Sequence, residues 1–215
     1  MLPTPLLAAG ELEFITKMVE NALYLLALLN PVSKVMFLSS YDPPLDRRHI
    51  FELAWKSSLA ALVILIILAG AGDLLLTRIF RVELYSLRMT GGLIVFMIGW
   101  CAVREGRFHP KTESPGLPEN FTDISLVPLA APLIAGPGTI AAAISGTAEF
   151  GLLSTSLALA LAIGINFIIM MFSPAINRFL GKVHALGPLI RLTGLIIAAV
   201  AVQMIITGLK ECIGQ

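Results

Sequence analysis

The chain has 215 residues, of which 57% are hydrophobic and 13% are charged, and its net charge at pH 7 is +1. Soluble domains carry about 25% charged residues, so the composition excludes an ordinary soluble domain and indicates an integral protein of the lipid bilayer. The small net charge gives no support to nucleic-acid binding. Cys101 and Cys212, the two cysteines, are expected to be free thiols.

Six apolar stretches follow one another along the chain, each near the roughly 20 residues that an α-helix needs to cross the hydrocarbon core. A loop rich in proline, glycine and charge separates the third stretch from the fourth. We therefore expect an all-α membrane protein with six transmembrane helices, divided into residues 1–104, a connecting loop 105–123 and residues 124–215. The six stretches fall near residues 13–40, 51–75, 85–103, 124–147, 152–172 and 189–209.

Lysines and arginines predict the orientation, because cytoplasmic loops of membrane proteins carry an excess of these residues. More of them fall in cytoplasmic loops when the N-terminus is placed outside. We expect a multi-pass protein of the cytoplasmic membrane with both termini outside.

The first and fourth predicted helices each contain residues that interrupt a helix. Asn30 and Pro31 lie inside the first, and Pro132 and the run Gly136-Pro137-Gly138 lie inside the fourth. Proline has no N–H to donate and its ring presses on the carbonyl four residues back, and glycine weakens the helix further. Freed backbone groups at membrane depth are tolerated only when they are buried in protein or line a cavity. We expect both helices to be discontinuous, with Pro31, Pro132 and Pro137 as hinges.

The two halves of the chain resemble each other at two places. The run 87–94 parallels 190–196, and Asn30-Pro31-Val32-Ser33 parallels Gly136-Pro137-Gly138-Thr139 at nearly the same offset. Each half has three predicted spans, an odd number, so the second half must enter the membrane upside down. The prediction is a pair of inverted three-helix repeats whose interrupted helices meet near the midplane, a signature of transporter binding sites.

Such a site would suit a small zwitterion. Beyond each proline a half-helix begins with unpaired N–H groups and a positive dipole end, and before each proline a half-helix ends in free carbonyls. Ser33 and Thr139 can cap the half-helices or donate to a carboxylate, and Gly136 and Gly138 let a ligand approach the backbone. We expect the carboxylate near Val32, Ser33, Gly138 and Thr139, and the ammonium near Leu29, Asn30, Ala135 and Gly136.

Further polar residues lie at membrane depth in the other predicted helices. Asn166 and Gln203 can line the pocket, but hydrogen bonding between helices explains them equally well. Thr90 and Thr193, at matching places in the two halves, are further possible lining residues. Arg88 and Arg191 occupy equivalent helix starts, where snorkelling to the interface is favoured over a charged gate.

These motifs carry a family resemblance. Asn30-Pro31, the run from Pro128 to Gly138, and Arg191-Leu192-Thr193-Gly194-Leu195 resemble the MarC family of six-span membrane proteins, within the LysE-like transporter superfamily. The resemblance covers nearly the whole chain and implies a transporter of small neutral amino acids. The first motif departs from the family pattern, since Ser33 stands where glycine is expected and Val35-Met36 supplies no second proline.

What the sequence lacks narrows the mechanism. It has no Walker-type phosphate loop, no nucleophile with a neighbouring base, and no metal-ligand spacing among its histidines, so we expect no enzyme, metal or cofactor. No acidic residue lies clearly at a membrane centre, where proton relays usually have one. A proton-coupled cycle therefore needs another route, and sodium bound by unwound carbonyls is equally compatible as the coupling cation. We expect a secondary transporter for amino acids such as glycine or alanine. The alternatives are a channel for ions or small solutes, and a scaffold or stress-related membrane protein that transports nothing.

Overall fold

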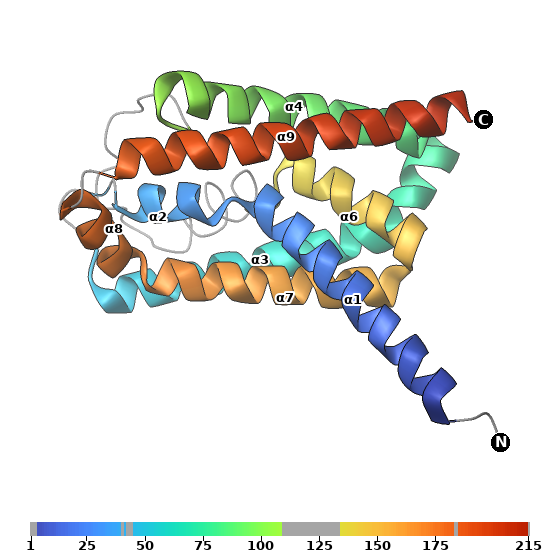
Figure 1. Cartoon of the computed structure of the whole chain (residues 1–215), viewed down its shortest axis with the longest axis horizontal. Coiled ribbons are helices and arrows are strands. Elements are labelled where there is room, and N and C mark those ends of the chain that lie inside the picture. Colours follow the sequence, from blue (N-terminus) through green and yellow to red (C-terminus); the bar gives the residue numbers. More distant parts are fainter. Residues whose placement is uncertain (1–3, 40, 42–44, 109–133, 183–184, 215) are drawn as a thin grey trace.

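The computed structural model describes residues 4–39, 41, 45–108, 134–182 and 185–214 (Figure 1). Within these ranges the chain is helical and contains no strand. The elements are α1 (Thr4–Leu29), α2 (Pro31–Ser39), α3 (Arg47–Asp73), the π-helical segment η1 (Leu74–Phe80), α4 (Leu84–Glu105), α6 (Pro137–Phe150), α7 (Leu152–Met171), α8 (Ser173–Lys182) and α9 (Leu186–Ile213).

Five stretches of the described residues are long and apolar enough to cross a membrane. The predicted all-α membrane protein is therefore confirmed for this part of the chain. The fourth predicted span, 124–147, lies partly outside the described residues, and α6 alone has 14 residues, too few to cross. Pro132 also lies outside them, so the count of six helices and the role of this proline stay predictions. The five stretches are Leu12–Ser39, Arg47–Gly72, Leu84–Glu105, Leu152–Met171 and Leu186–Ile213.

Helix α1 ends at Leu29 and α2 begins at Pro31. Asn30 between them has a φ of 50°, in the left-handed region that asparagine adopts more readily than most residues. Pro31 occupies the first position of α2, where its missing N–H would have had no helical partner. Helix α6 begins in the same way, with Pro137 in its first turn and Gly136 as an extended residue before it.

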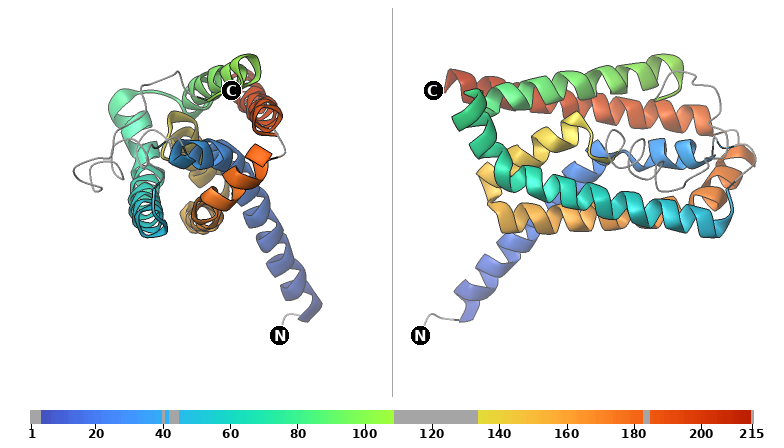
Figure 2. Two further views of the ribbon diagram at one scale, coloured as in Figure 1. Left: turned by 90° about the vertical axis from the view of Figure 1, so that its left-hand side faces the viewer. Right: turned by 180° about the vertical axis from the view of Figure 1, so that it is seen from behind.

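The two short helices lie inside the bundle and start near its middle (Figures 1 and 2). From there α2 runs toward one end of the bundle and α6 toward the other. The pairs α3 and α7, and α4 and α9, also run in opposite directions along the bundle. Both termini lie at the same end, and the first turns of α1 lean away from the other helices.

Helices α4 and α9 pack side by side along most of their length (Figure 1). Glycines make this contact close. A Cβ at Gly99 would lie 2.7 Å from the carbonyl oxygen of Gly194, and a Cβ at Gly208 would lie 2.9 Å from the carbonyl oxygen of Tyr85. Because these neighbours are backbone atoms that cannot swing aside, a larger residue would force the helices apart. The glycines of α4 and α9 therefore serve the packing of these two helices.

Candidate functional site

A small cavity lies where α2 and α6 begin, and we call it the central cavity. Its volume is about 70 Å³. Its polar lining comes from Asn30, Ser33 and Lys34 on one side and from Gly136, Gly138 and Thr139 on the other. Leu28, Val95, Ile98, Phe108 and Ile197 add apolar surface. The structure thus brings together, in one cavity, the two runs that the sequence places more than a hundred positions apart.

Asn30 caps helix α2. Its side-chain Oδ1 accepts a hydrogen bond from the Ser33 backbone N–H at 3.3 Å, the bond that an N-cap residue makes with the third helical residue. The Ser33 hydroxyl donates back to the Asn30 carbonyl at 2.8 Å. Both residues are buried. The capping role considered for Ser33 therefore belongs to Asn30, and the hydroxyl proton of Ser33 is engaged within its own helix turn.

Lys34 is the residue that sequence reasoning missed. Its side chain is 1% exposed, lines the central cavity, and donates from Nζ to the carbonyl oxygen of Leu29, the last residue of α1. Among the residues that the structure describes, no acidic side chain pairs with it. The signal was present, because a lysine inside an apolar span is rare and marks function by default.

The other predicted site residues fall into three groups. Leu29 and Ala135 are buried next to the central cavity but do not line it, and Val32 packs on the apolar cluster of Val95 and Ile197. Pro31 and Pro137 are the first residues of α2 and α6. The four polar residues of the other helices lie outside this region. Asn166 is buried on α7, with its Nδ2 3.3 Å from the Met170 sulfur, and the Thr193 hydroxyl donates to the Leu189 carbonyl. Thr90 is exposed, and Gln203 lines a second cavity.

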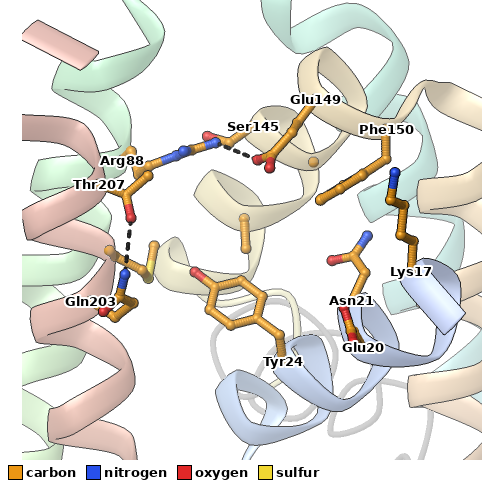
Figure 3. A pocket seen from close by; sticks show the side chains of 13 residues that line it. Lys17, Glu20, Asn21, Tyr24, Arg88, Ser145, Glu149, Phe150, Gln203 and Thr207 are labelled. Carbon is orange, nitrogen blue, oxygen red and sulfur yellow. Dashed lines mark hydrogen bonds and ion pairs between the residues drawn. The ribbon is translucent and has the colours of Figure 1, made fainter. Parts of the chain in front are cut away.

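The second cavity, here called the peripheral cavity, has a volume of about 270 Å³ (Figure 3). Helices α1, α4, α6 and α9 all contribute to it. Asn21 and Tyr24 come from α1, Arg88 from α4, Ser145 and Glu149 from α6, and Gln203 and Thr207 from α9. Sequence reasoning named Gln203 and Arg88 but had no means of bringing them together with α1 and α6.

Arg88 joins three helices at this cavity. Its Nη1 lies 2.5 Å from Glu211 Oε1 on α9, and its Nη2 lies 3.4 Å from Glu149 Oε2 on α6. The arginine side chain is 12% exposed, whereas the two carboxylates are 40% and 55% exposed. Arg88 therefore forms ion pairs between helices here, in place of the snorkelling that the sequence favoured.

The apolar helices and the buried polar cavities between them define the class: this is a multi-pass integral membrane protein. The sequence model of the MarC family of integral membrane proteins matches residues 15–213, and the chain belongs to this family. The MarC resemblance seen in the motifs is thereby confirmed.

Curated relatives align with this chain over most of their length. A UPF0056 membrane protein of Pyrococcus horikoshii is 33% identical over 89% of this chain and 93% of its own. The UPF0056 membrane protein YvbG of Bacillus subtilis is 30% identical over 86% of this chain and 90% of its own. The UPF0056 inner membrane protein MarC of Salmonella typhimurium is 30% identical over 88% of this chain and 92% of its own. No solved structure matches the chain.

Proposed function

We propose that the protein is a secondary transporter that moves small neutral amino acids, such as glycine and alanine, across the cytoplasmic membrane by alternating access. The observation that carries the proposal is the central cavity, where the first turns of α2 and α6 meet the amine of Lys34. Each helix start carries about half a positive charge. Two helix starts and one amine around a single cavity favour an anionic group, and they disfavour a channel for cations.

The substrate carboxylate completes the charge balance at Lys34. A buried cation at membrane depth is costly unless it is paired and hydrogen-bonded. Lys34 has the Leu29 carbonyl as a partner, but no carboxylate among the described residues. We place the substrate carboxylate between Lys34, the start of α6 and the hydroxyl of Thr139. The ammonium then faces the backbone carbonyls of Asn30 and Gly136, which line the cavity.

The size of the central cavity supports a small substrate. Its volume of about 70 Å³ is little more than that of two water molecules, because each water occupies roughly 30 Å³ in the liquid. Gly138 faces the side chain of Val95 so closely that an added Cβ would overlap it. A compact amino acid fits these limits better than a bulky drug does.

The architecture supports two inverted repeats. The proposed repeats are residues 1–104 and 124–215, joined by 105–123. Within them the pairs α2 and α6, α3 and α7, and α4 and α9 run in opposite directions, as an inverted repeat requires (Figure 1). Termini at one end of the bundle agree with an even number of crossings, and thus with six spans. We propose that this end lies outside, as the distribution of basic residues predicts. In this proposal Pro31, Pro132 and Pro137 are hinges for the movement between outward-open and inward-open states.

Counterflow tests the proposal. Proteoliposomes are preloaded with glycine, alanine, leucine or buffer, and the entry of radiolabelled glycine is measured, then repeated under imposed proton and sodium gradients to identify the coupling cation. We expect exchange with glycine and alanine and none with leucine. Conductance without counterflow would instead establish a channel. Silence in both assays from folded protein would leave the scaffold interpretation.

A further inference from the structure

The peripheral cavity holds polar groups that nothing in the central site explains. The Nδ2 of Asn21 and the hydroxyl of Ser145 are buried, in residues that are only 7% and 2% exposed, and neither has a hydrogen-bond partner among the residues that the structure describes. A buried donor that makes no hydrogen bond costs about 1–3 kcal/mol of stability. Both residues line the same cavity, from α1 and from α6 (Figure 3). Both residues line one cavity, so a small rotation of either side chain would bring its free donor to a ligand bound there.

Arg88 adds a third donor to the same cavity. Its Nη1 is firmly paired with Glu211, but its Nη2 lies 3.4 Å from Glu149. Charge-assisted bonds of this kind are normally about 2.7–2.9 Å long, so the contact with Glu149 is a loose one. A carboxylate between Arg88, Asn21 and Ser145 would meet three donors and displace only this weak contact.

Acidic groups at the edge of the cavity supply the complementary charge. Glu149 and Glu20 line the cavity and are exposed, so neither is committed to a buried ion pair. When a carboxylate takes the Nη2 of Arg88, Glu149 is released toward an ammonium group. Arg88 and Glu149 lie next to each other in this cavity, and together they match the two charges of a zwitterion.

Helices α1, α4, α6 and α9 contribute to both cavities. Along each of them, a residue of one cavity lies three, four or seven positions from a residue of the other, and residues at these spacings share a helix face. The pairs are Tyr24 and Leu28, Arg88 and Val95, Ala142 and Thr139, and Met204 and Ile197. Six residues of α-helix separate Ser145 from Thr139, a rise of about 9 Å.

The peripheral cavity is open toward one end of the bundle. It adjoins a further cavity of about 380 Å³, which shares Arg88, Ser145, Glu149 and Thr207 with it. That cavity is also lined by Thr77 of η1 and by Glu83, next to α4, at the end of the bundle where both chain termini lie (Figure 1). A solute from this side therefore meets the peripheral cavity before the central one.

We propose that the peripheral cavity is a second binding site for a small zwitterionic amino acid, about two helical turns from the central cavity on the route to it. The carboxylate binds Arg88 with the Ser145 hydroxyl and the Asn21 amide, and the ammonium binds Glu149. The class of solute rests on the proposed function, but the site itself rests on its own unsatisfied donors. The substrate would stay bound at this site until a movement of α6 connects it to the central cavity.

Equilibrium binding of radiolabelled alanine to the purified chain in lipid nanodiscs tests this proposal. The variants are Ser145→Ala and Asn21→Leu. Neither breaks a hydrogen bond between described residues, so we expect unchanged or higher melting temperatures. Ser58→Ala is the matched control, because Ser58 is another buried serine whose hydroxyl has no partner in the described part of the chain, and it lies outside both cavities. Thr139→Val reports on the central cavity.

We expect two alanines bound per wild-type chain. Ser145→Ala and Asn21→Leu should each weaken one of the two sites about tenfold, the loss expected for one hydrogen bond to a charged group. Thr139→Val should weaken the other site, and Ser58→Ala neither. Two-site binding that is unchanged in both Ser145→Ala and Asn21→Leu would overturn the proposal. A single binding site in the wild type, weakened only by Thr139→Val, would also overturn it but would leave the proposed transporter intact.

Two further results separate this proposal from the transporter itself. Two-site binding with the expected losses, but no counterflow, would remove the proposed function and leave the peripheral binding site. A folded wild-type chain that binds neither alanine nor glycine would overturn both.

Discussion

Replacing Lys34 by methionine should separate function from stability. Methionine has a similar length and no charge, and the position is fully buried, so the packing is nearly conserved. A lysine at the centre of a spanning helix costs about 2.5–3.5 kcal/mol to insert, and Lys34, which lies nearer the end of the Leu12–Ser39 stretch, should cost no more than this. Its bond to the Leu29 carbonyl returns about 1.5–3 kcal/mol as a hydrogen bond of a charged group. The balance predicts that Lys34→Met is between equally stable and about 2 kcal/mol more stable than the wild type.

Transport should move in the opposite direction. Losing the charged partner of a buried carboxylate costs about 2–5 kcal/mol, and each 1.4 kcal/mol is tenfold, so kcat/KM for glycine should fall about 30-fold or more. Counterflow measures transport, and thermal melting in nanodiscs measures stability. Lys56→Met is the control, because the Lys56–Glu52 pair at 2.5 Å is more than a third exposed and such pairs contribute about 0–1 kcal/mol. Full transport by Lys34→Met, or its unfolding, would refute the reasoning.

Three further substitutions test the packing around the site. Gly138→Ala should lose transport and about 1–3 kcal/mol of stability through overlap with Val95; thermal melting should recover when Val95→Ala is added, and no recovery would contradict the overlap. Gly194→Leu should destabilise the chain by more than 3 kcal/mol, because the new side chain would clash with the backbone of α4. Gly164→Ala should instead add about 0.5–1 kcal/mol of stability in the same melting assay, because a Cβ at Gly164 would meet no described atom within 4 Å. Asn30→Ala should cost about 2 kcal/mol through the lost cap and the positive φ, and Asn30→Gly only a few tenths; equal melting of the two variants would exclude this account.

The parts of the site that depend on local backbone chemistry could be predicted from the sequence. Proline and glycine act on the backbone next to them, so the starts of α2 at Pro31 and of α6 at Pro137 follow from the residue types alone. At both helix starts the cause and its effect are neighbours along the chain.

The peripheral cavity could not be predicted in this way. Asn21, Arg88, Ser145 and Thr207 come from four helices, and only the packing of those helices brings them together. Lys34 is a different kind of omission. Its charge was visible in the sequence, but its direction, toward the cavity instead of lipid, depends on how α2 is rotated within the bundle. Asn30 shows a third limit, because the residue expected at the ligand turned out to hold the backbone of α2 as well.

The glycine contacts between α4 and α9 have a mechanical consequence. Gly99 and Gly194 let the backbones of α4 and α9 approach so closely that a Cβ added at either position would lie less than 3 Å from a backbone atom of the other helix. We therefore expect these two helices to move together as one unit. Cys101 lies near the end of α4, and Cys212 lies near the end of α9, which runs in the opposite direction (Figure 1). Spin labels on these two native thiols should then keep a constant separation while other helices of the bundle rearrange.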